Sequence, residues 1–562
     1  MLNPQRFRTL ILVLVGWTAV AFGRLVQVQL FEHDEWEAES QKQREKTVEV
    51  EEPRGEIRTR DGRLLAGSLE RVAVYANPRQ VPRAAWPAVA ASLAPVLHRT
   101  AADILKDFSS RDGFFYLFKD LDPEVRPSID RLRQRGIGCL RMERRIYPHG
   151  SFAAPTVGFI DGEGIGRAGL EATYDRTLRG TPSVYHELRD GKIASTALGL
   201  RLDRQGRAGQ SLVLTLDAGV QQVVEEELQR TLDEIGAKGI AAVVMDIDSG
   251  EVLGLGSLPA FDPGKPGVGP AENRHNRVVE TSIEPGSTFK PFIVAAALKA
   301  GVLQPWELVD CSGGGVSIAG VFIHDHARFG ALSLRDMLAK SSNAGTIRVA
   351  YRTPPDALDE IIRGFGFGRP TRIELPAEAA GVYHGPRNWS ALSRAGLAIG
   401  QEIIVTPIQL AQAYATIANG GVLVHPTLVI ETRDPDGTVA ARHQATPGER
   451  VLPADVARNL ASFLEAVVDE GTGKQARVEG FRVAGKTGTA QKPVAGSYAA
   501  GRHAAWFAGF LAMPAPRLVI VVCVDEPKAT FWAADVAAPA FGRIANRLVT
   551  LLGLTPSEGV KT

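Results

Sequence analysis

The N-terminus carries one long apolar run. Arg6 and Arg8 precede an uncharged run of fifteen residues from Thr9 to Gly23, and a mostly apolar stretch follows Arg24. A membrane-spanning helix needs about 20 residues, a length that is reached here if Arg24 extends its charged end to the membrane surface. We therefore predict a short cytoplasmic tail and transmembrane anchor over residues 1–30. The arginines before the run place the N-terminus in the cytoplasm and the remaining chain outside.

A cleavable signal peptide is the alternative for this segment. Ala19-Val20-Ala21 has the small-x-small form of a cleavage site. Both interpretations export most of the chain. The apolar character continues past the cleavage site, which favours a retained anchor.

Residues 31–205 consist of short segments, some with the apolar spacing of helices and others with that of strands. The charge-dense residues 36–52 predict a helical or extended connector, and Asp61-Gly62 marks a tight turn between two short strands. Residues 89–97 and 104–108 have helical spacing, whereas residues 114–118 (FFYLF) predict a strand. This part shows no catalytic constellation, so we expect a non-catalytic scaffold domain.

Residues 206–555 begin and end with apolar strand patterns. SLVLTLDAGVQQVVEEEL predicts a strand followed by a helix with Asp217 as its N-cap, and GIAAVVMDIDSGEVLGLGS predicts two strands joined by a turn. HAAWFAGFLAM and RLVIVVCVDEP predict two further strands, followed by a helix over about residues 534–552. Because the middle of this region is largely helical, we expect an α/β fold in which both ends build one sheet covered by helices.

Composition excludes several classes of protein. The chain of 562 residues has 64 Lys and Arg against 63 Asp and Glu, so its net charge is +1. This balance shows no overall excess of positive charge of the kind that nucleic-acid binding uses. Its three cysteines are far apart in sequence, which excludes a disulfide framework and a CxxC-type zinc site. His324-Asp325-His326 is the one local histidine cluster, and we interpret it as a solvated loop.

Ser287-Thr288-Phe289-Lys290 is the first motif with chemical meaning. Pro285 and Gly286 predict a turn, and the apolar run after them predicts a helix that starts near Ser287. A serine and a lysine three residues apart share one helix face, which suits a serine nucleophile whose base is lysine. A helix N-terminus also offers unpaired N–H groups to a developing oxyanion.

Two further motifs follow in the chain. In Ser341-Ser342-Asn343, the hydroxyl of Ser341 could relay a proton and the amide of Asn343 could hold a substrate amide. Lys486-Thr487-Gly488-Thr489 predicts a strand in which both threonines point the same way and can bind a carboxylate. Gly488 leaves room for a ligand beside the backbone, and Lys486 supplies positive charge for an anionic substrate.

A nucleotide-binding interpretation competes for the third motif. GFRVAGKT, residues 480–487, formally satisfies the Walker A pattern. The segment after it contains proline and glycine where the helix of a phosphate-binding loop would run. An exported domain also meets little nucleotide, so we reject this interpretation.

The order SxxK, SxN and KTG is typical of penicillin-binding proteins and class A β-lactamases. With RGEIRTRDGRLLA, NRHNRVVETSIEPGSTFKP, AIGQEIIVTPIQLAQAYATIANGG and VAGKTGTAQK, the chain resembles the class B penicillin-binding proteins over nearly its whole length, specifically monofunctional peptidoglycan D,D-transpeptidases of the FtsI-like type. The resemblance implies an elongated pedestal domain over 31–205 and a transpeptidase domain over 206–555, with a central antiparallel sheet flanked by helices.

The resemblance also assigns roles to residues. Ser287 would be the acylated nucleophile, Lys290 its base, and Ser341 and Asn343 a second wall of the site. The substrate-binding strand would comprise Lys486, Thr487, Gly488 and Thr489, and the N–H groups of Ser287 and Thr489 would form the oxyanion hole. Attack on a D-Ala-D-Ala bond, loss of D-Ala and capture by another stem's amine would need no metal, nucleotide or other cofactor.

The expected setting is the bacterial cytoplasmic membrane, with the catalytic domain on its outer, periplasmic side. The implied ligands are stem peptides and β-lactams. EPGST followed by SSN resembles the division-type branch, whose partner would be a glycan polymerase of the FtsW/RodA type together with other divisome proteins. An elongation- or sporulation-type transpeptidase, a β-lactam sensor and a β-lactamase remain alternatives, whereas no glycosyltransferase motif supports a bifunctional enzyme.

Overall fold

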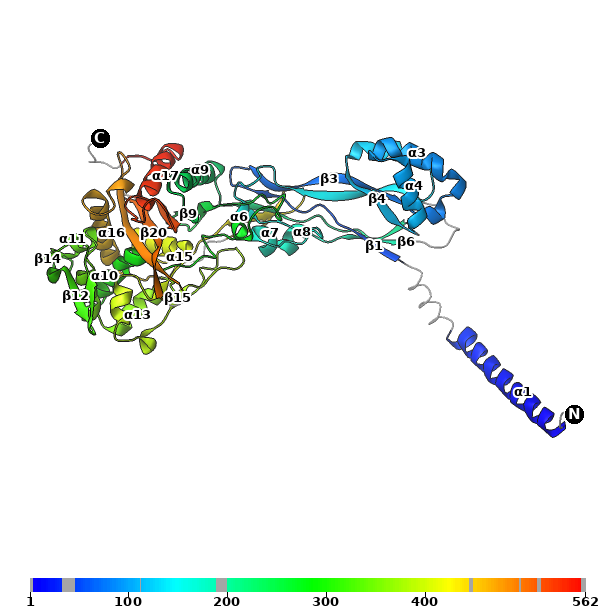
Figure 1. Ribbon diagram of the computed structural model, residues 1–562, viewed down its shortest axis with the longest axis horizontal. Helices are drawn as coiled ribbons and strands as arrows, with labels where there is room; N and C mark the ends of the chain where they lie inside the picture. The colour runs from blue at the N-terminus through cyan, green and yellow to red at the C-terminus, as the bar shows by residue number, and fades with distance from the viewer. Residues whose placement is uncertain are drawn as a thin grey trace. The chain divides into compact units, whose positions relative to one another are not determined.

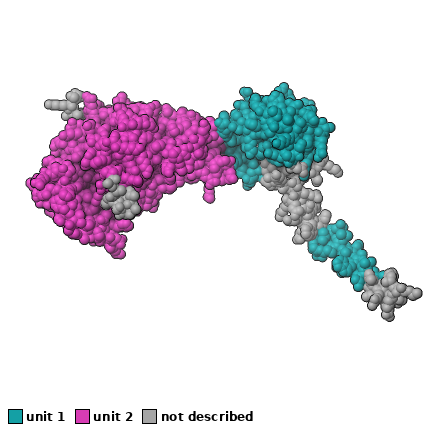
Figure 2. Space-filling model, in the orientation of Figure 1, with its two compact units in different colours: residues 1–53, 69–144, 180–208 teal, residues 54–68, 145–179, 209–562 magenta. Residues whose placement is uncertain are grey.

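The computed structural model describes residues 4–32, 46–111, 113–187, 200–443, 448–494, 497–512 and 517–556 (Figure 1). The chain forms two compact units (Figure 2). Unit 1 contains residues 1–53, 69–144 and 180–208, and unit 2 contains residues 54–68, 145–179 and 209–562. The domain boundaries expected after residues 30 and 205 stay predictions.

The N-terminal apolar run forms one continuous helix. Helix α1 (Pro4–Val26) continues as a π-helical turn, η1 (Gln27–Phe31), and its 19 residues Ile11–Gln29 have a mean hydropathy of 1.8 with no burial against the protein. By length and composition this helix can cross a membrane, and a signal sequence would have the same properties. The connector expected over residues 36–52 lies partly outside the described residues, and its described end is strand β1 (Lys46–Val50).

Unit 1 contains two small sheets and a few helices. Strand β1 pairs with β6 (Ser183–Glu187), which pairs with β7 (Leu200–Arg204). Strand β3 (Leu64–Ala76) starts beside β2 (Ile57–Arg58) in unit 2 and continues into unit 1, where it pairs with β4 (Phe115–Leu121) and β5 (Ile137–Ile146). The helices are α3 (Trp86–Leu97), α4 (Ala101–Ser110) and α5 (Arg126–Asp130), and their apolar faces form a separate core with these strands.

Both ends of the C-terminal region build one antiparallel sheet, as the strand patterns predicted. Its order is β10 (Val252–Leu258), β9 (Gly239–Asp246), β21 (Leu518–Asp525), β20 (Ser497–Ala512) and β19 (Arg482–Val494). Strands β9 and β21 are apolar at nearly every position because helices bury both faces of the sheet. Of the described strands, only β20 pairs with β19, which is therefore an edge strand.

Different helices cover the two faces of this sheet (Figure 1). Helices α9 (Ala218–Ile235) and α17 (Ala537–Leu551) pack on one face, and α15 (Pro407–Ala418) lies on the other face in the core that also contains α10 (Lys290–Lys299). The carboxylate of Asp217 accepts hydrogen bonds from the backbone N–H groups of Gly219 and Val220 at 2.9 and 3.0 Å, which confirms the predicted N-cap of α9.

The largely helical middle of unit 2 carries several short strands. Its remaining helices are α11 (Leu334–Ala339), α12 (Asn343–Arg352), α13 (Pro355–Gly364), α14 (Ser393–Ala398) and α16 (Ala454–Asp469). Its two-stranded pairs are β11 (Leu308–Asp310) with β14 (Ala331–Ser333), β12 (Gly315–Ile318) with β13 (Val321–His324), and β15 (Val382–Tyr383) with β16 (Ile403–Ile404). Strands β8 (Ser211–Leu214), β17 (Val429–Arg433) and β18 (Val439–Arg442) extend a second sheet from β2.

Buried ion pairs join the N-terminal segments of unit 2. Glu171 lies in α7 (Gly169–Thr173), between the short helices α6 (Ala154–Val157) and α8 (Asp175–Arg179). Its fully buried carboxylate accepts hydrogen bonds from Arg54 Nε and Arg145 Nε, each at 2.7 Å. Since a buried charge is costly without partners, this network fixes the segments around residues 54, 145 and 171 to one another.

Candidate active site

Ser287 and Lys290 lie where the edge strand meets helix α10. Residues Gly286–Phe289 form a 3-10 turn, η6, and Lys290 is the first residue of α10, so the predicted helix start consists of two helical forms. Ser287 is half-buried and Lys290 is completely buried. Gly286 has a φ of 55°, which favours glycine, and a methyl group there would lie 2.9 Å from the backbone oxygen of Thr489. The turn that carries Ser287 is therefore packed against the backbone of β19.

The Nζ of Lys290 joins the first motif to the second. It donates hydrogen bonds to the backbone oxygen of Ser341 at 2.6 Å, to the hydroxyl of Ser341 at 3.2 Å and to Oδ1 of Asn343 at 2.7 Å. Burial lowers the pKa of Lys290 to about 7, and the nearby negative charge of Asp325 opposes that shift. A lysine with such a pKa is partly neutral at physiological pH and can accept a proton.

Ser341 owes its orientation to a strained backbone. It lies in the short link between α11 and α12 and has a φ of 56°, a left-handed conformation that is rare for residues other than glycine. This conformation directs its carbonyl oxygen and its hydroxyl to the same lysine. Strain of this kind persists only where surrounding contacts hold it, and it is common at functional sites.

Asp325 is a residue of this site that sequence reasoning missed. Its carboxylate accepts hydrogen bonds from the Ser342 hydroxyl at 2.8 Å and from the backbone N–H of Asn343. The amide of Asn343 donates to the backbone oxygen of His324 at 2.8 Å, which fixes Oδ1 toward Lys290. His324, the last residue of β13, and His326 are exposed as predicted, but Asp325 between them accepts hydrogen bonds at the start of α12 and holds the second motif in place. No local signal links it to residues 341–343.

The third motif lies within edge strand β19, as predicted. A methyl group at Gly488 would lie 2.4 Å from the backbone oxygen of Pro285, so only glycine allows the turn before Ser287 to approach the strand. Burial, together with the positive charge of Lys290, holds the pKa of Lys486 well below its usual value. The positive charge expected at Lys486 is therefore disfavoured in this structure, because its Nζ is out of contact with water.

The hydroxyls of the two threonines have partners within the protein. Thr487 Oγ1 lies 2.7 Å from Thr472 Oγ1, and Thr489 Oγ1 accepts a hydrogen bond from the backbone N–H of Ala533 at 3.1 Å. Thr472 was missed by sequence reasoning. Its backbone N–H also donates to the oxygen of Ala339, two residues before Ser341, at 3.3 Å. The loop at Thr472 therefore bridges the second and third motifs.

The three motifs thus meet in one place in unit 2. Among the described residues, the hydroxyl of Ser287 has no hydrogen-bonding partner, whereas both lysines are engaged elsewhere. Hydrogen bonds between catalytic side chains are often long or absent before a substrate binds. The arrangement offers a serine hydroxyl without a partner among the described residues, a buried lysine of low pKa and an edge strand, a set that suits acyl transfer.

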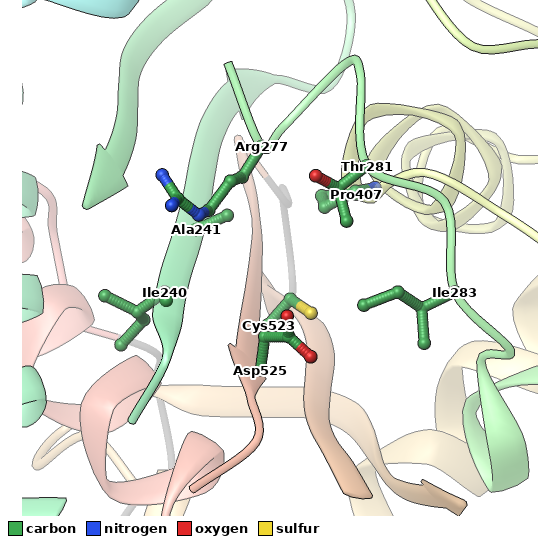
Figure 3. A pocket seen from close by; sticks show the side chains of 9 residues that line it. Ile240, Ala241, Arg277, Thr281, Ile283, Pro407, Cys523 and Asp525 are labelled. Carbon is green, nitrogen blue, oxygen red and sulfur yellow. The ribbon is translucent and has the colours of Figure 1, made fainter. Parts of the chain in front are cut away.

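A small cavity nearby is not part of this arrangement. It has a volume of about 10 Å³ and is lined by the ends of β9 and β21, by the segment of Arg277, Thr281 and Ile283, and by Pro407 (Figure 3). Figure 3 shows Cys523 and Asp525 of β21 at its floor. None of the eight predicted site residues lines it, and it has room for about one water molecule.

Comparison with known proteins places the whole arrangement in a family. Residues 240–546 match the penicillin binding protein transpeptidase domain, and residues 49–214 match the penicillin-binding protein dimerisation domain. The chain is 31% identical over 551 residues to the peptidoglycan D,D-transpeptidase FtsI of Escherichia coli K12, covering 96% of this chain and 90% of that one. It is 36% identical over 496 residues to the penicillin-binding protein PbpB of Mycolicibacterium smegmatis, covering 84% and 75%.

Solved structures show the same fold. Penicillin binding protein 3 of Mycobacterium tuberculosis in complex with aztreonam superposes with a TM-score of 0.71 at 28% identity, over 91% of this chain and 99% of that one. A peptidoglycan synthetase of Bifidobacterium adolescentis gives a TM-score of 0.79 at 24% identity, over 92% and 99%. These matches confirm the α/β fold and the resemblance seen in the sequence. The chain belongs to the class B penicillin-binding proteins, the family of peptidoglycan D,D-transpeptidases that combine a dimerisation domain with a transpeptidase domain.

Proposed function

We propose that this protein cross-links peptidoglycan stem peptides through an acyl-enzyme on Ser287. One observation carries the proposal: the buried Nζ of Lys290 lies at hydrogen-bonding distance from both Ser341 and Asn343, beside the turn that holds Ser287. The three motifs are far apart in sequence, and a structural role alone would not require a buried lysine at their meeting point.

The reaction has two halves. Neutral Lys290 accepts the proton of the Ser287 hydroxyl while Oγ attacks the carbonyl carbon of the penultimate D-Ala. The peptide C–N bond breaks, terminal D-Ala leaves with a proton returned through Lys290 and Ser341, and an ester to Ser287 remains. An amine of a second stem then attacks this ester, forms the new peptide bond and returns the proton to Ser287.

The other motif residues support these steps. The backbone N–H groups of Ser287 and Thr489 would bind the oxyanion, for which the contact of Gly286 with the Thr489 backbone is the supporting observation. Thr487 and Thr489 would bind the terminal carboxylate. Because Gly488 has no side chain, the ligand could lie against the backbone of the strand. A substrate carboxylate would also favour the charged form of Lys486, which burial disfavours in its absence.

We further propose the division-type role, with septal cross-linking and a membrane glycan polymerase of the FtsW type as partner. The relative named FtsI, matched over nearly full length, supports this assignment. The apolar helix α1 would be the retained anchor that holds the catalytic domain on the outer side of the cytoplasmic membrane.

Three experiments test the proposal. The whole-protein mass after incubation with penicillin should increase by one penicilloyl group that lasts, since rapid turnover of the drug would instead identify a β-lactamase. A cross-linking assay with un-cross-linked peptidoglycan distinguishes the transpeptidase from a sensor, which would be acylated but would form no cross-links. Depletion in cells should block septation; a block of elongation or of sporulation would contradict the division-type role.

A further inference from the structure

The backbone carbonyl of Thr288, the residue after Ser287, receives no hydrogen bond from the helix that follows it. Phe289 is the N-cap of α10, so the first oxygen that accepts a bond of this helix is that of Phe289, one residue further on. Three positions after Thr288 stands Pro291, which has no N–H and cannot complete a 3-10 hydrogen bond to the Thr288 oxygen. Thr288 is completely buried. Because a buried carbonyl without a partner is costly, this oxygen needs a donor from elsewhere in the fold.

Tyr414 of helix α15 supplies that donor. Its hydroxyl donates a hydrogen bond to the backbone oxygen of Thr288 at 2.9 Å, across 126 positions of the sequence. The side chain of Tyr414 is completely buried, which raises the pKa of its hydroxyl well above the usual value. The hydroxyl therefore stays protonated and remains a donor at any pH at which the protein is folded.

The ring of Tyr414 is fixed by its surroundings. It meets the ring of Phe292 edge to face, with the ring centres 5.8 Å apart, and Phe292 contacts Phe289 at 5.3 Å. Helix α15 itself begins with a capping box, in which Thr406 and Gln409 exchange hydrogen bonds of 2.9 and 3.2 Å between side chain and backbone. The hydroxyl of Tyr414 is thus held at its position before any substrate binds.

The turn that carries Ser287 is anchored on both sides of this residue. Before it, the indole N–H of Trp506 donates to the backbone oxygen of Glu284 at 3.1 Å. After it, Tyr414 holds the carbonyl of Thr288. The peptide groups from which the hydroxyl and the N–H of Ser287 project are therefore held by buried side chains of two distant elements, β20 and α15.

We propose that Tyr414 is a positioning residue for the acylation of Ser287, whose turn it holds through the carbonyl of Thr288. The inference rests on the proposed function, because it concerns acylation of the same serine. Tyr414 acts through the backbone and takes no part in proton transfer. Without its hydroxyl the buried carbonyl would lose its donor and the turn would rearrange, and a displacement of about 1 Å can slow a reaction by about 100-fold.

The variant Tyr414→Phe tests this role, since it removes the hydroxyl and keeps the ring. Stopped-flow acylation of the full-length protein over a series of penicillin concentrations separates the dissociation constant of the initial complex from the first-order rate constant of acylation. The rate constant should fall about tenfold or more, and the dissociation constant should stay unchanged. A lower stability alone would reduce the number of reactive molecules and leave this rate constant as it is. An unchanged rate constant would overturn the proposal.

The pH profile distinguishes positioning from proton transfer. Because the Tyr414 hydroxyl stays protonated, Tyr414→Phe should lower the rate constant by the same factor at every pH between about 6 and 9. The midpoint set by Lys290 should stay where it is in the unchanged protein. A displaced midpoint would mean that the hydroxyl takes part in the titration of the site, and the positioning role would be wrong.

Tyr351→Phe is the matched control. The Tyr351 hydroxyl also donates to a backbone oxygen, that of Ala391 at 3.0 Å, but this oxygen lies outside the turn of Ser287. Its loss should leave the rate constant of acylation unchanged. An equal decrease in both variants would show a general effect of losing a tyrosine hydrogen bond, and the proposal would fail.

The same measurement separates this proposal from the proposed function. If penicillin never acylates the unchanged protein, the proposed function fails and the positioning role fails with it. If the unchanged protein and Tyr414→Phe are acylated with equal rate constants, the proposed function stands and only the positioning role is refuted.

Discussion

The Nζ of Lys290 lies 2.7 Å from Oδ1 of Asn343, and this contact crosses 53 positions of the sequence. Asn343 is held in that orientation by a second hydrogen bond, from its Nδ2 to the backbone oxygen of His324. The amide thereby presents an acceptor to the lysine and no donor.

Ser287→Ala should abolish labelling by penicillin while leaving the fold intact. The Ser287 hydroxyl is half-buried and has no hydrogen-bonding partner among the described residues, so its loss removes no contact that stabilises the protein. Peptide mass mapping of the adduct, together with a thermal melt, measures both effects. Ser151→Ala, at an exposed serine, serves as the control, and an adduct on any serine other than Ser287 would refute the assignment.

Lys290→Arg and Lys486→Arg should have different consequences. A guanidinium stays protonated at accessible pH, so arginine at position 290 cannot accept the serine proton, and acylation should slow by about 100-fold or more. Arginine at position 486 supplies the cationic form that a bound carboxylate would favour there, and it should leave slower but measurable acylation. The second-order rate constant with one penicillin compares the two variants, and a near-normal rate for Lys290→Arg would show that this lysine is not the base.

The rate of acylation should rise with pH through about 7. Burial lowers the pKa of Lys290 to about 7, and only the neutral amine accepts a proton, so the active fraction grows as pH increases past that value. Acylation rates measured by stopped flow between about pH 5.5 and 9 define the pH at which the rate is half its maximum. A rate that falls across this range would mean that the protonated lysine is the active form.

Asp325→Asn should shift that midpoint to lower pH. The Asp325 carboxylate favours the charged form of Lys290, so its neutralisation lowers the lysine's pKa further, whereas Asn can still accept hydrogen bonds at the start of α12. Asp325→Ala should in addition slow acylation at every pH, because Ser342 and Asn343 lose their cap. Asp217→Asn, at the N-cap of α9, is the control for loss of a capping charge and should leave the pH profile unchanged.

Glu171→Gln should destabilise the protein by about 3–5 kcal/mol, as the loss of one partner of a buried ion pair does. Glu171 is fully buried between Arg54 and Arg145, and a neutral amide would leave the Arg145 guanidinium without this counter-charge and the Arg54 guanidinium paired with Asp175 alone. Urea unfolding followed by circular dichroism measures the change. Glu234→Gln, in the solvent-exposed pair with Arg230, should alter the unfolding free energy little, and equal effects at both positions would contradict this account.

Much of the fold follows from patterns between near neighbours. The apolar runs of β9 and β21, the N-cap Asp217 and the strand that contains residues 486–489 each depend on a few adjacent residues, and the structure has them as predicted. The order of the three motifs also identified the family before any contact was known. The sequence likewise indicated that both ends of the C-terminal region build one sheet, because apolar strand patterns stand at both ends of a largely helical region.

Tertiary structure alone decided the partners and the charges of the site. The histidine cluster predicted a solvated loop, yet its Asp325 accepts hydrogen bonds at the start of α12, and Thr472 contacts Thr487 from a loop that carries no motif. The sequence predicted a positive charge at Lys486, whereas burial disfavours that charge in the structure. Local propensity depends on covalent neighbours, but hydrogen-bonding partners and pKa values depend on which distant atoms exclude water from a group, and only packing determines that.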